Sequence, residues 1–348
     1  MSTVATARHR PAQRGAALLT AMMIVALVAT LASSMIWQQW RAIQVEAAER
    51  ARTQSAWVLG GALDWARLIL REDGKTVGRK GIEVDDLNEP WATPLQEARL
   101  STFLAADKSN TDDAPDAFLS GSITDAQARF NLTNVFSNGQ PNDSQIEALQ
   151  RLCTSVGVST DVALRIAAGM RDASPPPPAA AASAPAAAAA AASAATPAIQ
   201  LPPPAALAPL MPRTVRQITW FGIDPETVRI LEPYVTILPE PTTVNANTAS
   251  REVLAAVTDL DPATAERLIQ ARQRSRFEDN TDITAQAPSV LPGNLVHLSV
   301  NSSYFEVRGR LRLGDVVLEQ RSLVLRRLNL PVVVLQHERV SSRDPGGS

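Results

Sequence analysis

Residues 14–40 read RGAALLTAMMIVALVATLASSMIWQQW, and no charged side chain occurs between Ala16 and Trp40. An apolar helix of this length rises about 1.5 Å per residue and can cross a bilayer core of roughly 30 Å. Three arginines and one histidine precede it within residues 8–14, and basic residues keep their flank of a span in the cytoplasm. The sequence therefore predicts a single membrane span at residues 16–40, with an exported body after it.

The junction between Gly15 and Ala16 resembles the site at which prepilin peptidase cuts, after a glycine that precedes an apolar run. Such a cut removes the basic cytoplasmic leader, here residues 1–15, and leaves the apolar helix on the mature protein. An ordinary secretory signal has an apolar region of only about 7–15 residues before its cleavage site, so it fits this sequence poorly. A glycine before an apolar stretch also occurs in many single-pass anchors, and the junction alone leaves both interpretations open.

The helical pattern continues beyond the apolar run and becomes two-sided. Small and apolar side chains recur on one stripe, whereas most charged side chains lie off it. We therefore expect one long helix over residues 16–70, in which Gly60 and Gly61 are the place where it can bend. A helix that is first apolar all round and then amphipathic suits a membrane or filament core followed by packing on a globular head.

The remaining sequence alternates between strand-like and helical patterns. Residues 71–135 contain turn formers and short strands, residues 136–298 contain helices, and residues 299–338 contain alternating strands. We expect an α+β head in which the first and last of these segments form one sheet and the middle segment is an inserted all-α domain. Within that domain, residues 174–212 are almost entirely Ala and Pro, which predicts a disordered spacer.

The strand patterns give more local predictions. Residues 122–132 predict a hairpin-like pair of short strands. Residues 305–325 alternate around a turn and predict a second hairpin, with a bulge in its second strand. Residues 331–336 predict a short edge strand, and residues 339–348 predict a disordered tail.

Composition disfavours several classes of function. A formal charge of -2 over 348 residues does not indicate a chain built to bind phosphate backbones. The single Cys153 cannot form an intramolecular disulfide, and the helical spacing of its apolar neighbours predicts a core position. The three histidines are scattered, and neither a zinc-binding set nor a nucleophile with a positioned base is found. We therefore predict a protein that is not an enzyme.

Several stretches together resemble the K-type minor pseudopilin (GspK) family of the type II secretion system. The more specific ones are residues 244–249 (VNANTA) and residues 301–306 (NSSYFE). Residues 14–20, 90–94 and 126–134 also match. These stretches are spread over nearly the whole chain, and only the Ala/Pro stretch is foreign to the family pattern.

The resemblance implies that the long helix is a pseudopilus core helix and that the strands form a pilin-like head. It implies a single-pass protein of the inner membrane, processed by prepilin peptidase, with its C-terminal body in the periplasm. Such a subunit is expected to join the I and J minor pseudopilins and the major pseudopilin. It is also expected to form the pseudopilus tip and to initiate assembly for protein secretion across the outer membrane.

The resemblance further implies calcium in the helical domain. Glu278, Asp279 and Asp282 are candidate ligands, and a solvated acidic loop is the alternative interpretation of these residues. A second acidic group, at residues 112–116, lacks the spacing of an EF-hand.

Thr20 would be the fifth residue of a mature chain that begins at Ala16. Major pilins and most pseudopilins resemble one another in having Glu at this position, where its carboxylate offsets the N-terminal ammonium of a neighbouring subunit. Thr20 cannot supply that charge. A threonine in an apolar helix also commonly donates to its own backbone, and the two interpretations are compatible.

Residues 247–274 resemble helix-hairpin-helix segments, some of which present backbone amides to DNA phosphates. Those segments usually have glycine in the hairpin, whereas residues 258–261 (TDLD) place two carboxylates there, and carboxylates repel nucleic acid. The alternative function is therefore a membrane-anchored, exported nucleic-acid-binding protein. We favour structural packing of the two helices and expect no nucleic-acid partner.

Overall fold

The structure, a computed structural model, describes residues 14–76, 78, 81–100, 117–137, 139–174, 199, 201, 209–313 and 316–343. The chain divides into two compact units, Met1–Gly60 and Gly61–Ser348. Four predictions concern residues that lie partly or wholly outside the described part: most of the basic leader, the acidic residues at 112–116, most of the Ala/Pro spacer, and residues 344–348 of the tail.

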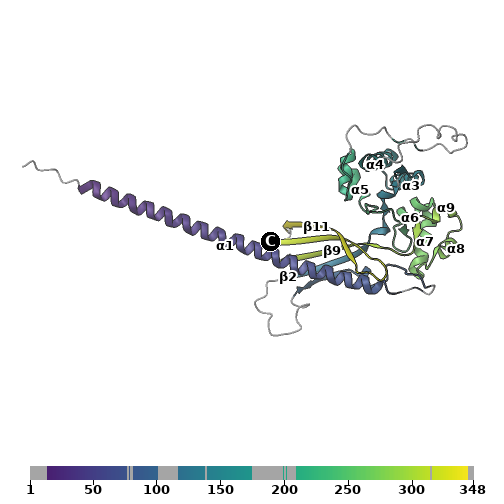
Figure 1. The fold of residues 1–348 in the computed structure, drawn as a ribbon, viewed down its shortest axis with the longest axis horizontal. Coiled ribbons are helices and arrows are strands. Elements are labelled where there is room, and N and C mark those ends of the chain that lie inside the picture. Colours follow the sequence, from purple (N-terminus) through teal and green to yellow (C-terminus); the bar gives the residue numbers. More distant parts are fainter. Residues whose placement is uncertain are drawn as a thin grey trace, which may run out of the picture. The chain divides into compact units, whose positions relative to one another are not determined.

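One helix, α1 (Arg14–Asp73), is 60 residues long. It contains the apolar run and continues beyond it (Figure 1). It is the one helix in the described part of the chain that is long and apolar enough to cross a membrane. In the first unit, every described side chain at residues 17–50 is exposed, including the apolar ones. The long helix predicted at residues 16–70 is therefore confirmed, and the helix is assigned without a break at Gly60 and Gly61.

Five antiparallel strands form the sheet of the second unit, in the order β1-β2-β9-β10-β11. These strands are β1 (Leu95–Arg99), β2 (Ala117–Asp125), β9 (Tyr304–Leu313), β10 (Val316–Leu325) and β11 (Val333–Arg343). β2 pairs with β9 along its whole length, from Ala117 opposite Leu313 to Asp125 opposite Phe305. Strands that flank the helical segment in the sequence thus join one sheet, as the predicted fold class requires.

The last turns of α1 pack on one face of this sheet. Leu63, Ala66 and Leu70 recur every three or four residues, which places them on one side of the helix. They are buried together with apolar side chains of β2, β9 and β10. Trp91, in the 3-10 helix η1 (Pro90–Ala92), belongs to the same core, and its ring meets the ring of Phe305 edge-on with 5.2 Å between centroids.

The chain between β2 and β9 is mostly helical and has a core of its own. Its helices are α3 (Asp143–Ser155), α4 (Thr160–Ala173), α5 (Pro225–Leu231), α6 (Arg251–Thr258), α7 (Pro262–Arg274), α8 (Asn280–Gln286) and α9 (Pro292–Leu295). Its 3-10 helices are η2 (Ala126–Ala128), η3 (Leu132–Val135) and η6 (Val215–Phe221). Cys153 of α3 is fully buried in this core, and burial raises the pKa of its thiol to about 11.

Short strands pair within the same segment. β3 (Phe130–Asn131) runs parallel to β6 (Val235–Thr236), β4 (Phe136–Ser137) antiparallel to β5 (Gln140–Pro141), and β7 (Val244–Asn245) parallel to β8 (Leu298–Ser299). The hairpin predicted at residues 122–132 is therefore wrong. Asp125 caps η2 by accepting a hydrogen bond from the Gln127 amide, so the chain turns out of the sheet and β3 pairs with β6 instead of β2.

β11 also differs from its prediction. It extends beyond the predicted edge strand as far as Arg343, so residues 339–343 of the predicted disordered tail are paired with β10. The edge of β10 that does not pair with β9 offers backbone hydrogen-bond donors and acceptors over this whole length. The bulge lies in β11 and not in β10, because Leu323 pairs with Gln336 and Val324 with Val334, which leaves Leu335 as the extra residue.

Candidate functional site

The predicted processing site lies in the first turn of α1, where Arg14, Gly15 and Ala16 are helical. The Thr20 hydroxyl follows and donates a hydrogen bond to the Ala17 carbonyl oxygen at 2.9 Å. A hydroxyl that is satisfied within its own helix can lie in an apolar environment at little cost. Cleavage between Gly15 and Ala16 stays a prediction.

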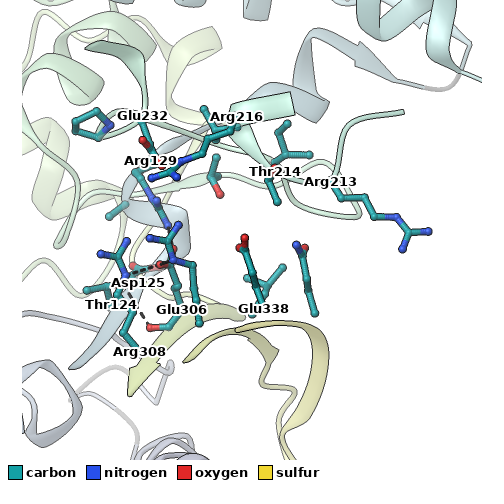
Figure 2. A pocket seen from close by; sticks show the side chains of 18 of the residues that line it. Thr124, Asp125, Arg129, Arg213, Thr214, Arg216, Glu232, Glu306, Arg308 and Glu338 are labelled. Carbon is teal, nitrogen blue, oxygen red and sulfur yellow. Dashed lines mark hydrogen bonds and ion pairs between the residues drawn. The ribbon is translucent and has the colours of Figure 1, made fainter. Parts of the chain in front are cut away.

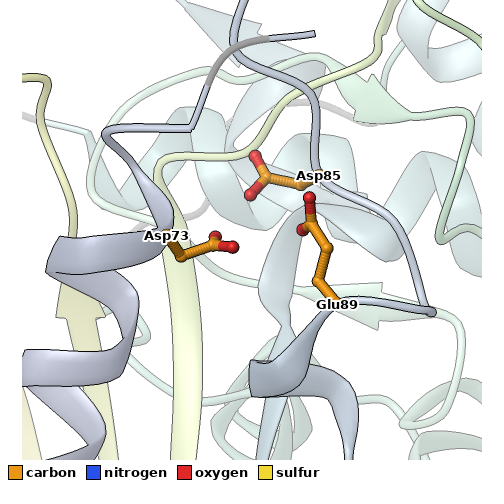
Figure 3. Close-up of side chains that lie close together, drawn as sticks. All are labelled: Asp73, Asp85 and Glu89. Carbon is orange, nitrogen blue, oxygen red and sulfur yellow. The ribbon is translucent and has the colours of Figure 1, made fainter.

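Three carboxylates converge where α1 ends beside the loop that precedes η1 (Figure 3). Asp73 lies in the last turn of α1, whereas Asp85 and Glu89 lie in the loop. One oxygen atom of each side chain lies within 4.8 Å of the others. Three negative charges this close together need a nearby cation if they are to be ionised in a partly buried position.

For Asp73 and Asp85 that cation is Arg326, which directly follows β10 and is only 3% exposed, whereas Glu89 lies 3.4 Å from Arg276. The Arg326 guanidinium donates to Asp73 at 2.6 Å and to Asp85 at 2.6 Å, and it lies 2.7 Å from Glu83. It also lies 4.6 Å from the ring centroid of Phe305, within the range of a cation–π contact. Arg326 thereby joins the end of α1 and the following loop to the sheet.

Burial raises the pKa of two of these carboxyl groups toward neutral pH. Burial raises the pKa of Asp73 to about 6, against the lowering effect of Arg326. Burial also raises the pKa of Glu89 to about 7, although Trp91 Nε1 donates a hydrogen bond to it at 2.7 Å. For Arg326, burial lowers the pKa, but Asp85 and Glu83 raise it by more. The Arg326 guanidinium therefore stays charged, whereas Asp73 and Glu89 change protonation near neutral pH.

This cluster does not fit the calcium that the family resemblance implies. Calcium takes six to eight oxygen ligands, typically at about 2.3–2.6 Å. A calcium ion among Asp73, Asp85 and Glu89 would lie beside a guanidinium that already binds two of them. The arrangement is that of a buried ion-pair network, in which arginine supplies the positive charge.

Two of the three calcium candidates named from the sequence, Asp279 and Asp282, accept hydrogen bonds from backbone amides around the start of α8. Asp279 accepts hydrogen bonds from the amides of Thr281 and Asp282, at 2.9 and 3.2 Å, at the start of α8. Asp282 accepts from the amide of Glu278 at 2.8 Å. Calcium at Glu278, Asp279 and Asp282 stays a prediction.

A second buried network connects the helical segment to the sheet. Asp125, at the end of β2, accepts hydrogen bonds from Asn245 at 3.1 Å, Thr248 at 2.6 Å and Ser302 at 2.6 Å. Burial raises the pKa of Asp125, whereas the Ser302 and Thr248 hydroxyls lower it. The Ser302 amide donates to Asp85 at 2.7 Å, so the two networks are continuous.

This second network explains the two sequence runs that resembled a known family. VNANTA supplies Asn245 and Thr248, and NSSYFE supplies Ser302. Asp85 and Arg326 were not among the site residues predicted from the sequence. Asp85 belongs to an acidic pair after a loop, and Arg326 is an arginine at the end of an apolar strand. Neither pattern is specific to a buried network.

The helix-hairpin-helix segment uses its turn carboxylates as caps and ion-pair partners. Asp259 ends α6 with a φ of 57° and lies 3.5 Å from Arg151. Asp261 accepts hydrogen bonds from two backbone amides at the start of α7. On α7, Arg272 donates to the Ala246 carbonyl at 2.7 Å. These contacts favour structural packing over contact with nucleic-acid phosphates.

The comparisons with known proteins agree with one another. Two sequence models, both described as type II secretion system protein K, match residues 128–240 and 244–301. The type II secretion system protein K of Pseudomonas aeruginosa is 29% identical to this chain over 88% of its length and 86% of the relative. That of Pectobacterium carotovorum is 27% identical over 90% of this chain and 93% of the relative.

The chain belongs to the type II secretion system protein K family. A solved structure supports the fold. A chain in the crystal structure of the GspK-GspI-GspJ complex of enterotoxigenic Escherichia coli matches with a TM-score of 0.58 at 20% identity, covering 85% of this chain and 99% of that chain. The predicted fold class, an α+β head with a long N-terminal helix and a helical insertion, is confirmed.

Proposed function

We propose that this member of the protein K family is a minor pseudopilin of a type II secretion system, which acts by assembly and not by catalysis. The observation that carries the proposal is α1. Its apolar first part is exposed over residues 17–40, as a helix made for a membrane or a filament core would be. Its last turns are buried against the sheet of the head.

The location follows from the same helix. Prepilin peptidase removes residues 1–15, and residues 16–40 span the inner membrane once before assembly. The basic residues at 8–14 support an orientation that places the C-terminal body in the periplasm.

The partners that we propose are the I and J minor pseudopilins, with the major pseudopilin forming the shaft. The structurally similar chain comes from a complex of GspK, GspI and GspJ, which supports this choice. The networks around Asp85 and Asp125 would hold the helical insertion and the sheet as one rigid head, as a subunit with several partners requires.

We place the subunit at the tip, where it initiates assembly. A subunit inserted beneath others would bury its helix beside a neighbour's ammonium, and Thr20 offers no carboxylate to offset that charge, at a cost of several kcal/mol. A leading subunit has no such neighbour above it. The helical insertion between β2 and β9 adds bulk to the head, which would obstruct further stacking on that side.

Co-purification tests the partner proposal. The tagged full-length chain, co-expressed with its I and J partners and extracted in a neutral detergent, should recover both in a salt-resistant complex. A gel-shift assay with duplex DNA in the same detergent tests the alternative function, nucleic-acid binding. Recovery of the chain alone, together with salt-sensitive binding to duplex DNA, would contradict the pseudopilin assignment and favour the nucleic-acid-binding alternative.

A further inference from the structure

A cavity of about 750 Å³ lies between the sheet and the segment formed by η6 and α5 (Figure 2). Phe305 and Val307 of β9 face the α1 side of the sheet, so alternation turns Glu306 and Arg308 to the opposite face, which is the cavity floor. β10 adds Arg321 to this floor. The assembly contacts proposed above do not account for this charged cavity.

Three guanidinium groups converge on one carboxylate in the cavity. Glu306 lies 2.8 Å from Arg129, 2.6 Å from Arg308 and 3.2 Å from Arg321. Burial raises the pKa of Glu306, but Arg129 and Arg308 lower it by more, so the carboxylate is ionised. Because arginine is always protonated in proteins, this group of four has two positive charges in excess.

The opposite wall does not neutralise this excess. Arg216 pairs with Glu232 at 3.1 Å, and Arg229 pairs with Glu226 at 2.5 Å, so each of these arginines is already balanced. Within the described residues, the Arg213 side chain at the rim has no ion pair. Positive charge is therefore concentrated where β9 and β10 meet the cavity.

Two further carboxylates determine which kind of anion the cavity can bind. Glu319 of β10 and Glu338 of β11 line the same floor and would repel a ligand with several negative charges. A single carboxylate meets less repulsion, and its planar shape matches the guanidinium fork. The Arg308 and Arg321 side chains are 43% and 33% exposed, so they retain N–H donors that a ligand can reach.

We propose that this cavity binds an acidic segment of a partner protein, through a carboxylate held between Arg308 and Arg321. The cavity volume is in the range that holds small ligands and a few peptide side chains. β11 is the last strand in the described sheet and borders the cavity through Gln336 and Glu338. An extended peptide can therefore lie along the free edge of β11 and direct an acidic side chain inward.

A peptide titration tests this proposal on the full-length chain in neutral detergent. The probe is a fluorescent, end-blocked peptide of Ala and Ser with a single central Glu, and its Gln counterpart is the uncharged control. Binding of the Glu peptide alone is expected. The double variant Arg308→Gln/Arg321→Gln should weaken binding at least about tenfold, because it removes charge-assisted hydrogen bonds. Arg274→Gln, on the exposed end of α7 outside the cavity, should leave the affinity unchanged.

A second variant gives an effect of opposite sign. Glu338 is exposed on β11, and Glu338→Gln should tighten binding several-fold by removing a repelling charge, which loss of folding cannot imitate. Equal affinity of the wild type and the double variant would overturn the proposal. So would displacement of the peptide by an equal concentration of inorganic phosphate, which would identify a general phosphate site. Because the isolated chain is titrated, the result is independent of whether it assembles with other pseudopilins.

Discussion

Arg326 supplies one positive charge to Asp73, Glu83 and Asp85 from a position that is 3% exposed. Removing it leaves buried carboxylates without a cation, so Arg326→Leu should lower the free energy of unfolding by about 3–5 kcal/mol. The matched variant Arg229→Leu removes a surface ion pair with Glu226 and should change the free energy of unfolding far less, because water screens both exposed charges. Urea denaturation followed by circular dichroism measures both, and equal costs would contradict a structural role for the Arg326 network.

Residue identity alone did not reveal this network. Arg326 and Asp85 are 241 residues apart in the sequence, and Arg326 and Asp73 are 253 apart. No periodicity or spacing rule connects such positions, because the sheet register brings them together. The sequence did single out Asn245, Thr248 and Ser302 through family resemblance, but without the buried Asp125 that all three contact.

At the scale of elements, α4 and η6 approach so closely that Gly169 has no room for a side chain. A Cβ atom there would lie 2.3 Å from the ring of Phe221. Gly169→Ala should therefore destabilise the protein by about 1–3 kcal/mol through overpacking, although alanine is the better helix former. Gly61→Ala in α1, where a Cβ meets no atom within 4 Å, should instead stabilise it by up to about 1 kcal/mol.

Thermal unfolding of the two variants under identical conditions checks the pair. Opposite shifts are expected, since the backbone preference is the same at both sites and only the surroundings of the added methyl group differ. A higher melting temperature for Gly169→Ala would show that α4 and η6 are not packed as described.

Elements with a strong internal period were predictable, whereas those defined by a partner were not. The apolar run of α1 and the alternation in β9 and β10 are properties of the local sequence, and both were predicted. The end of β11 depends on the free edge of β10, and β3 depends on β6, so neither could be obtained from the pattern of its own residues. The same reasoning explains why the cavity arginines, which come from different elements, were not grouped in advance.

At the scale of the whole molecule, the proposed pseudopilin combines a helical insertion in its head with a threonine at the fifth position of the proposed mature chain. The helical insertion separates β2 from β9 in the sequence without breaking their pairing, so the pilin-like sheet is retained. The Thr20 hydroxyl, at the position where the family resemblance leads one to expect a carboxylate, donates a hydrogen bond to the Ala17 carbonyl oxygen. Together these features suit a subunit that leads a filament, and they predict that Thr20→Glu is tolerated in assembly.

Immunogold labelling of assembled pseudopili measures the position of the subunit directly. An epitope inserted in the Ala/Pro stretch at residues 174–212 marks this chain, and the same epitope on the major pseudopilin is the control that should label the whole shaft. Labelling at one end of each pseudopilus is the predicted result, for the wild type and for Thr20→Glu alike. Labels spaced at intervals along the shaft would contradict the tip assignment.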